Sequence, residues 1–554
     1  MPDRLRDLLG GLAAMALGIA AFFVFAGWWV LIPTNIAFLD VGDRAMHTLG
    51  WMFFRDAPWG TPPGASPRLG IELANSIALV DGLPLFAIPF KLLSPWLPRP
   101  FQYWGYWWLL SFTLQALFGY LVARQMGGRR LVALLAAGFV VITPAFLFRT
   151  TLHMALSGHW TILAAMYLYA RRTPPRLYAW PLLAGLTASI HAYLLAMVLG
   201  LWLAAWVQRL WTRRIGWRHA ILEPVLIALV AVLVLWLVGF FYTGSLGSYG
   251  FGSYRLNLFW PFLTYRDWSQ LVPDLPHAKY DYEGLSFLGI GILAILVLSI
   301  FSGAVAKLRV LVTARWLPLL LMALLLMVCA LSNHIGVLGI ELPAIPIGDR
   351  LEALGGIFRS SGRFVWPILY LVTIGAVVLL GRRFSPAWAV LVMTACLAAQ
   401  IVDSQPGWSQ FRTYAPPPSA QWSTDLKSGF WQRAADAGYT AVRAIPAAYK
   451  GLDWRQLEYY AVLHHMAVDS VYLGRVDQAA LDALNASDDQ AMDTGNFEPR
   501  TIYVLDADAA DRIKDHATSD DLLAVVDNRY VFVPGGARLA AGLDDVTPLP
   551  LLGD

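Results

Sequence analysis

Carboxylate, histidine and arginine side chains gather in one short stretch that follows the first long apolar run. The stretch 38–59 contains Asp40, Asp43, Arg44 and His47 among aromatic residues. Asp40 and Asp43 are three residues apart, a spacing that would place both on one face of a helical turn. His47 follows Asp43 by four residues, so it could act there as an acid, an orienting group or a binding group. Because charges at the rim of a bilayer are costly to keep, they often mark function.

Two roles compete for these acids. Carboxylates are favoured at helix N-termini, and capping or solvation is the favoured role for Asp40. For Asp43, which has His47 on the same expected helix face, we favour a functional role. The two acids could hold a divalent cation such as Mg or Mn through oxygen, but we assign no metal ligand. The chain shows no His/Cys spacing typical of zinc.

A second set of polar residues lies near the expected outer ends of other apolar segments. Several histidines at one face indicate a shared polar cavity. The expected cavity residues are Glu72, Asp81, His153, His159, His191, Tyr193, Tyr282 and Glu283. Glu72 and Asp81 belong to the first loop itself, where both are ambiguous and Asp81 could equally be a helix N-cap. Arg359 and Arg363, in IFRSSGRFVWP, are exceptions to the tendency of basic residues to stay on the cytoplasmic side. Arginine is the usual bidentate partner of phosphate, so both are candidate phosphate ligands.

The composition sets the class of protein. The chain has 554 residues, of which 58% are hydrophobic and 14% charged, whereas soluble domains average about 25% charged residues. A mean hydropathy of +0.55 implies more apolar surface than a soluble core can absorb. We therefore expect a polytopic α-helical membrane protein. Cys329 and Cys396 fall inside apolar runs and are expected to be packing residues.

Charge is distributed unevenly along the chain and predicts its orientation. Residues 405–554 carry 12 basic and 21 acidic residues, and residues 1–404 carry 29 basic and 16 acidic residues. Basic loops tend to stay in the cytoplasm, so we expect the acidic region on the other side of the membrane. Arg4 and Arg6 precede the first apolar run, which predicts a cytoplasmic N-terminus. The basic loops thus indicate membrane orientation and not nucleic-acid binding.

About 11 transmembrane helices account for the apolar runs of residues 1–404, with a first outer loop at 33–102. Within that loop, segment 71–93 is apolar but interrupted by Pro84 and Pro89. Amphipathic helices on the membrane surface fit this segment better than a span does. With that assignment, every basic cluster falls on the cytoplasmic side.

Residues 405–554 have the pattern of a soluble α/β domain outside the cytoplasm. A proline-rich linker at 413–419 precedes the domain. Strands are expected at 440–446, 469–475, 501–507 and 522–534, and helices at 453–466, 477–487 and 508–517. The region contains no GxGxxG, P-loop or G-x-S-x-G motif.

This layout resembles the GT-C superfamily of membrane glycosyltransferases. Shared features are the many spans, the cytoplasmic N-terminus and a first outer loop with an acidic residue and surface helices. The segments that carry a closer resemblance, to a family of bacterial polytopic proteins related to that superfamily, are GDRAMHTLGWMFFRDAPW, SIALVDGLPLFAIPFKLLSP, FQYWGYW, YEGLSFLG and FRSSGRFVWP. The resemblance covers residues 1–400 and implies a bacterial inner-membrane protein with a periplasmic C-terminal domain.

Carried over by position, the resemblance implies a catalytic role for Asp43, with Asp40 as the competing choice and His47 beside them. It implies a sugar donor on a polyprenyl phosphate, whose phosphate Arg363 or Arg359 would hold. The acceptor would be an envelope glycan or lipid, and a single displacement would invert the anomeric carbon. The motif DVGD departs from the adjacent acids of the superfamily, which leaves the need for a metal open.

Two other classes of protein compete with a glycosyltransferase. A lipid or glycan transporter, such as a flippase, would show inverted repeats and charges in the middle of its spans. The chain shows no repeat, and its charges lie mainly in the loops. A non-catalytic membrane scaffold with an outer binding domain would leave the acids of the first loop without a role.

Overall fold

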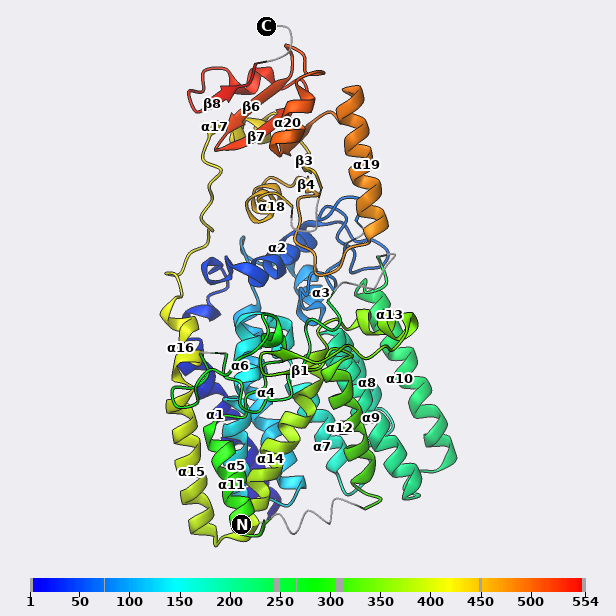
Figure 1. The fold of residues 1–554 in the computed structure, drawn as a ribbon, viewed down its shortest axis with the longest axis vertical. Helices are drawn as coiled ribbons and strands as arrows, with labels where there is room; N and C mark the ends of the chain where they lie inside the picture. The colour runs from blue at the N-terminus through cyan, green and yellow to red at the C-terminus, as the bar shows by residue number, and fades with distance from the viewer. Residues whose placement is uncertain are drawn as a thin grey trace. The chain divides into compact units, whose positions relative to one another are not determined.

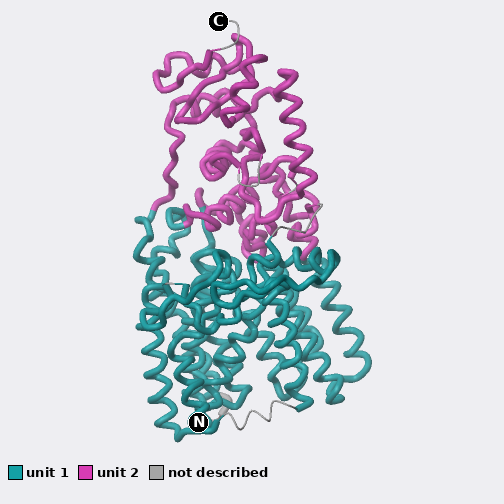
Figure 2. The backbone as a smooth tube through the Cα atoms, viewed as in Figure 1, with its two compact units in different colours: residues 1–38, 101–234, 247–418 teal, residues 39–100, 235–246, 419–554 magenta. Residues whose placement is uncertain are grey.

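A computed structural model describes residues 3–73, 75–243, 250–265, 267–304, 313–447 and 451–550 (Figure 1). The chain divides into two compact units (Figure 2). Unit 1 comprises residues 1–38, 101–234 and 247–418, and unit 2 comprises residues 39–100, 235–246 and 419–554. The first loop thus groups with the C-terminal region, about 320 residues further along the chain.

Unit 1 is a bundle of apolar helices. Its helices are α1 (Asp3–Phe25), α4 (Trp104–Gln125), α5 (Arg130–Val141), α6 (Pro144–Thr151), α7 (Trp160–Ala170), α8 (Ala179–Ala188), α9 (Ala192–Trp211), α10 (Trp217–Leu237), α11 (Ile290–Phe301), α12 (Leu317–Leu331), α13 (Asp349–Ile357), α14 (Trp366–Arg383), α15 (Pro386–Asp403) and α16 (Gln405–Thr413). The last residues of α10 belong to unit 2. A two-stranded hairpin, β1 (Gly336–Val337) and β2 (Ile340–Glu341), lies between α12 and α13.

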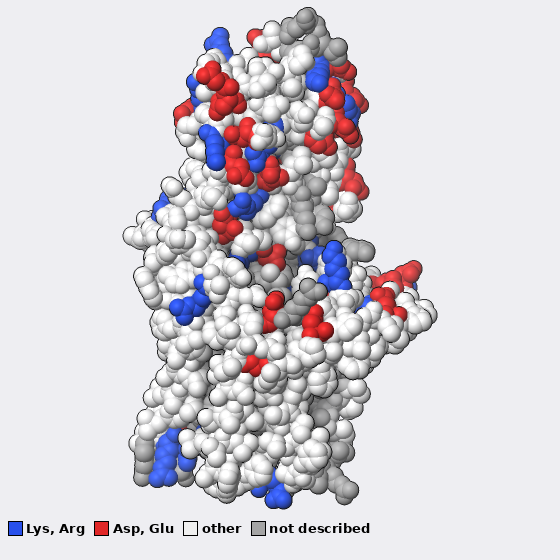
Figure 3. Space-filling model, turned by 60° about the vertical axis from the view of Figure 1, so that its left-hand side comes forward, with Lys and Arg blue, Asp and Glu red and all other residues white. Residues whose placement is uncertain are grey.

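Six helices in the described residues are long and apolar enough to cross a membrane. They are Leu5–Phe25, Trp104–Gln125, Ala192–Trp211, Trp217–Leu237, Ser361–Arg383 and Pro386–Asp403. The bent pair α5 and α6 passes the same test as one element and would make a seventh. The face drawn in Figure 3 shows a broad surface almost free of charged side chains over the long helices. Since such a surface suits lipid and not water, the chain is a helical membrane protein.

Local sequence explains where these helices begin and what they bury. Proline occupies the first turn of α12, α14 and α15, where its missing N–H costs no hydrogen bond. Arg382 and Arg383 end α14, where positive charge is favoured by the helix dipole. Large rings such as Trp107 and Trp108 of α4 are fully buried and fill the interior of the bundle.

Unit 2 is built on a six-stranded mixed sheet in the order β4-β3-β5-β7-β6-β8. Its strands are β3 (Ala441–Ile445), β4 (Ala467–Val468), β5 (Thr501–Leu505), β6 (Leu522–Val526), β7 (Arg529–Val533) and β8 (Val546–Pro548), and its helices are α2 (Gly42–Asp56), α3 (Pro84–Leu92), α17 (Gly429–Asp436), α18 (Trp454–Leu463), α19 (Gln478–Thr494) and α20 (Ala507–Ile513). β3 pairs in parallel with β4 and β5, and the other pairs are antiparallel. A core of apolar side chains that includes Ile445, Leu505 and Phe532 lies under the sheet.

The first loop extends this sheet at its β4 edge. Leu69 forms a parallel bridge with Val468. The Gly70 N–H donates to the Val468 carbonyl at 2.8 Å, and the Val468 N–H donates to the Arg68 carbonyl at 2.9 Å. In the same unit, α2 of the first loop packs against α18. Unit 2 is therefore a composite of two distant parts of the sequence.

Several expectations for these elements can be compared with the structure. The helix expected near Asp43 is confirmed as α2, and the strands expected at 440–446 and 501–507 are confirmed as β3 and β5. The strand expected at 469–475 was wrong, because β4 ends at Val468. The run 522–534 is not one strand but the hairpin of β6 and β7. In segment 71–93 the described helix is α3, which begins only at Pro84.

Candidate functional site

A buried carboxylate, Glu283, lies between two arginines in unit 1. Arg363 donates to Glu283 Oε2 from Nη2 at 2.7 Å and from Nε at 3.2 Å. Arg149 Nη2 lies 3.0 Å from the same oxygen and donates to the Glu283 backbone carbonyl at 2.5 Å. His153 Nε2 lies 3.7 Å from the other oxygen, Oε1. This cluster joins three segments of the chain that are far apart in sequence.

The four side chains come from the ends of apolar helices. Arg149 lies in the last turn of α6, and His153 follows that helix. Glu283 belongs to the short 3-10 helix Asp281–Gly284, which precedes α11, and Arg363 belongs to Ser361–Val365, which leads into α14. Charged groups at such positions are expensive to bury unless they are paired.

The arginines determine the charge of Glu283. Burial alone would raise the pKa of its carboxyl group, but the positive charges of Arg149 and Arg363, with a smaller contribution from His153, hold that pKa well below its usual range. Glu283 is therefore ionised at neutral pH, and one negative charge faces two guanidinium groups. Arg149 Nη1 is buried and has no hydrogen-bond partner in the part of the chain that the structure describes. The two guanidinium groups thus share one carboxylate, and Arg149 Nη1 is an unused donor among the described residues, which an anionic group could bind.

Tyr193 and His191 support the cluster from α9. The Ser360 N–H donates to the Tyr193 hydroxyl at 2.8 Å, and the Arg363 guanidinium lies 4.9 Å from the centroid of the Tyr193 ring. His191 caps α9 by accepting a hydrogen bond from the Tyr193 N–H at 3.1 Å. These two residues position Arg363, and His191 has the role of a helix cap.

A second buried polar chain lies among the helices of the same unit. His159 Nδ1 is 2.7 Å from the Tyr370 hydroxyl, which also accepts from Gln115 Nε2 at 2.8 Å. His159 Nε2 is buried without a hydrogen-bond partner among the described residues. The Trp366 ring links the two groups, since its centroid is 4.1 Å from that of His159 and 5.9 Å from the Arg149 guanidinium carbon.

Arg359 lies outside the Glu283 cluster, and Tyr282 lies at its margin, near enough to interact with the charge of Arg149. The Arg359 guanidinium stacks 5.8 Å from the Tyr254 ring centroid and makes no ion pair within the described ranges. Tyr282 packs edge-on against Phe148 with centroids 6.4 Å apart. Of the two predicted phosphate ligands, Arg363 is therefore paired with an acid, and Arg359 is the one whose charge is not balanced by a neighbouring carboxylate.

The acids of the first loop belong to unit 2 and have different surroundings. Asp40 forms an ion pair with Arg455 of α18. Asp43 lies half-buried in the first turn of α2, where the helix dipole favours a carboxylate. Asp40 thus has an ion-pair partner inside its unit, and the choice of Asp43 over Asp40 as the catalytic acid stays a prediction.

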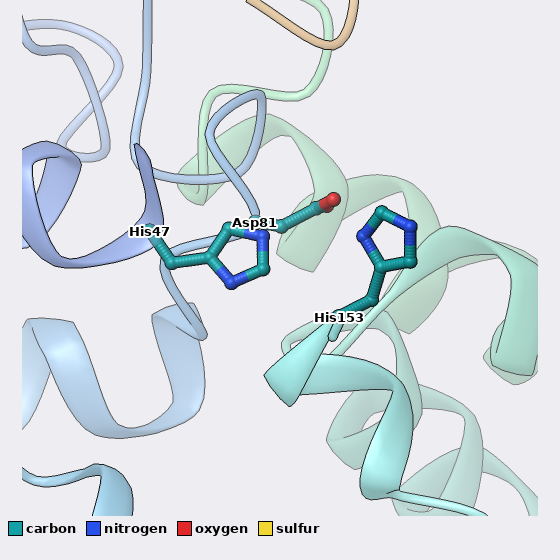
Figure 4. Close-up of side chains that lie close together, drawn as sticks. All are labelled: His47, Asp81 and His153. Carbon is teal, nitrogen blue, oxygen red and sulfur yellow. The ribbon is translucent and has the colours of Figure 1, made fainter. Parts of the chain in front are cut away.

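His47 and Asp81 approach each other within unit 2. His47 is fully buried on α2, and its ring offers a nitrogen within 4.8 Å of an Asp81 carboxylate oxygen (Figure 4). Asp81 holds its backbone in the left-handed region, with φ of 49°. His153, also labelled in Figure 4, belongs to unit 1 and was described with Glu283. An imidazole and a carboxylate side by side can hold a proton or contribute ligands to a hard cation.

Glu72, another member of the predicted cavity set, pairs with the C-terminal region within unit 2. Its two carboxylate oxygens accept from Arg443 of β3 at 2.8 and 3.1 Å. Arg443 also donates to Asp469 and to Glu498. Glu72 is therefore an ion-pair partner inside unit 2.

The sequence singled out Arg149 beside His153 and His159, but it gave no role to Arg443. Arg443 is the single charged residue of the apolar run TAVRAIP. Burying such a run also buries the charge, and a buried charge requires an acidic partner. A lone arginine in an apolar strand was thus a signal that could have found Arg443, although not its partners.

Comparison with known protein families assigns the chain to one of them. Residues 15–405 match the family described as Domain of unknown function (DUF6311), and residues 430–534 match the DUF6311 C-terminal domain. The chain belongs to the DUF6311 family. No curated protein matches it. The two matched regions follow the division between the apolar helices and the C-terminal strands of this DUF6311 protein.

Proposed function

We propose that this DUF6311 protein is a membrane glycosyltransferase of the GT-C type. It would transfer a sugar from a polyprenyl-phosphate donor to an envelope glycan or lipid acceptor at the outer face of the inner membrane. The observation that carries the proposal is the Glu283 cluster, in which two buried arginines face one carboxylate. An arginine donor left without a partner among apolar helices favours an anion attached to a lipid, because such a ligand reaches the site from the bilayer.

The proposed transfer needs a general base for the acceptor hydroxyl and positive charge for the departing phosphate. In a single displacement the acceptor hydroxyl loses its proton to a general base as its oxygen attacks the anomeric carbon, and the phosphate departs with the bonding electrons. From the sequence we assign the base to Asp43, and from the Glu283 cluster we assign the binding of the donor phosphate to Arg363 and Arg149, with Arg359 as a further candidate. His47 lies one turn after Asp43 on α2 and would orient the carboxylate or the acceptor.

The proposal includes 11 spans, with the N-terminus in the cytoplasm and the C-terminal region in the periplasm. Six long helices and the bent pair supply seven. The shorter apolar helices α7, α8, α11 and α12 would complete the set. Short helices can span only a thinned or protein-lined part of the bilayer, which also suits a cavity open to lipid.

Binding of the donor phosphate tests the cluster. The purified full-length protein in nanodiscs is titrated with a polyprenyl monophosphate. Arg363→Gln should weaken binding by about ten- to a hundredfold, because each charge-assisted contact is worth about 1.5–3 kcal/mol. Arg363→Lys should restore it only in part, because the ammonium lacks the planar fork. Arg350→Gln, which removes an exposed arginine from α13, is the matched control. Unchanged affinity in a variant with glutamine at 149, 359 and 363 would rule out the site.

Transfer itself is measured with a polyprenyl-phosphate-linked sugar and membrane acceptors. Asp43→Asn should lower the rate by about 10²–10⁴-fold with expression and folding intact, since the change keeps the size of the side chain and removes the base. Near-normal activity in Asp43→Asn would shift the role to Asp40. Near-normal activity in both asparagine variants would refute the mechanism.

A further inference from the structure

The C-terminal region has no role in the proposed chemistry, yet it makes an extensive set of contacts with the first loop. Arg443 lies on β3, one strand in from the β4 edge of the sheet, and its side chain is 6% exposed. Within the C-terminal region it donates to Asp469 Oδ2 at 3.2 Å and to both oxygens of Glu498 at 3.1 and 3.2 Å. Two domain carboxylates therefore already bind this arginine.

Glu72 adds a third carboxylate from the first loop. Its two oxygens accept from Nη1 and Nη2 of Arg443 at 3.1 and 2.8 Å. A fourth acid, Asp488 of α19, is 7% exposed, and its Oδ2 has no hydrogen-bond partner in the described part of the chain. The arginine is thus surrounded by more negative charge than it can neutralise. Charge balance inside the domain does not require Glu72, so its contact has to be explained by what it does for the loop.

Backbone pairing attaches the same stretch of the loop. Arg68, Gly70 and Ile71 exchange main-chain hydrogen bonds with Val468 at 2.8–3.3 Å. This is strand addition to a free sheet edge, in which the main chain gives affinity and a side chain fixes the register. Two further contacts hold the loop, since Arg68 Nη1 donates to the His465 carbonyl at 2.9 Å and Asp40 pairs with Arg455.

We propose that the C-terminal domain positions the first loop and that Arg443, through Glu72, is the residue that clamps it. The proposal rests on the proposed function in one respect, namely that the clamped loop carries Asp43. Arg443 is a positioning residue here and has no contact with substrate. The domain then contributes to transfer by holding α2 in place.

Cutting the linker tests this clamp in the full-length protein. Residues 416–418, exposed in the structure, are replaced by a protease site, and the chain is cleaved after purification in detergent. The fragment 419–554 should remain bound and co-elute with the rest of the chain, because the first loop holds it. Glu72→Gln keeps the shape of the side chain and leaves Arg443 its two domain acids. It should speed release of the fragment by about tenfold.

Two further variants and an activity measurement complete the design. Arg443→Lys, which loses both bidentate contacts, should release at least as fast as Glu72→Gln. Arg512→Gln, which removes an exposed arginine that pairs with Asp489 and Asp493, should release at the wild-type rate. In the uncut chain, Glu72→Gln should lower kcat for transfer with KM for the donor unchanged.

The outcomes separate the clamp from the proposed function. A wild-type fragment that leaves as soon as the linker is cut, or equal release from Glu72→Gln and wild type, would overturn the clamp. Faster release with unchanged kcat would overturn its positioning role. If no transfer is found in any form of the protein, the glycosyltransferase proposal fails, while the release rates still decide whether the domain holds the loop.

Discussion

Glu283 forms ion pairs with two buried arginines, Arg149 and Arg363. It therefore stabilises their positive charges and also competes with any anionic ligand for them. Glu283→Gln should therefore have two effects of opposite sign. Leaving two buried guanidinium groups without their acid should lower the free energy of unfolding by about 3–5 kcal/mol. The same change should tighten binding of a polyprenyl monophosphate, because the phosphate would no longer compete with the carboxylate. Thermal unfolding in detergent and the binding titration measure the two effects.

Asp349→Asn is the control for Glu283→Gln, because Asp349 is an exposed acid of α13. It should change stability by less than about 0.5 kcal/mol. A Glu283→Gln protein as stable as wild type would show that the two arginines do not depend on this carboxylate.

Asp488 makes the stability of the C-terminal domain depend on pH. Burial, together with the negative charges of Glu72 and Glu498, raises the pKa of Asp488 to about 6, against the opposing charge of Arg443. An unfolded aspartate has a pKa of about 3.9. The folded state therefore binds the proton more tightly, and the stability that this provides is present below about pH 4 and lost as pH rises through about 6.

Asp488→Asn removes the ionisable group. It breaks no hydrogen bond at Oδ2, because that atom has no partner among the described residues. The variant should match wild type near pH 3 and exceed it at pH 8 by on the order of 2–3 kcal/mol. Unfolding of both proteins is followed across that pH range. A stability difference that does not change with pH would contradict the assignment.

At the scale of elements, α2 depends on α18. The two helices pack together in unit 2, and Asp40, just before α2, pairs with Arg455 of α18. Arg455→Gln should accelerate hydrogen exchange of the α2 amides by about two- to fivefold, the range for a partly exposed ion pair. Lys514→Gln, which breaks an exposed pair with Asp511 at the end of α20, should leave α2 exchange unchanged. Equal α2 exchange in Arg455→Gln and wild type would mean that packing alone holds the helix.

Some helices and strands could be predicted from local sequence patterns, and others could not. The start of α2 was predictable because Asp43 is a carboxylate of the kind favoured in the first turn of a helix. β3 and β5 were predictable from short apolar runs. The hairpin within 522–534 was missed, although Asp527 and Asn528 lie between the strands with φ of 47° and 62°. Two such residues form the tight turn that joins antiparallel strands, so the Asp-Asn pair was the available signal.

At the scale of the whole molecule, membrane topology can be tested directly. With Cys329 and Cys396 replaced by serine, Ser419→Cys and Ser385→Cys place one thiol after the linker and one in the turn between α14 and α15. A membrane-impermeant thiol reagent added to intact spheroplasts should spare position 385, because Arg382 and Arg383 beside it favour the cytoplasmic side, and should label position 419 on the opposite side. The reverse pattern would place the C-terminal region in the cytoplasm.

Long-range partners mark the limit of what the chain alone could reveal. The apolar helices were predictable from composition, because lipid imposes length and hydropathy on each span. The pairing of Glu283 with Arg149 joins residues 134 apart, and that of Glu72 with Arg443 joins residues 371 apart. No local pattern encodes such separations, since the three-dimensional path of the chain sets them. Several residues of the candidate site could thus be expected at one face from the sequence, but which of them pair came only from the structure.

The sheet edge completed by residues 68–71 has a consequence for biosynthesis. Translation proceeds at about 5–20 residues/s, so the 371 residues between Glu72 and Arg443 take about 20–70 s to make. Through that interval the nascent loop has already emerged, with its main-chain groups and the carboxylate of Glu72 still awaiting their partners. The order of synthesis therefore requires the membrane helices to be inserted before the loop can fold. A ribosome that stalls or terminates before β3 would leave the first loop without its fold, and an unfolded segment is a target for proteases.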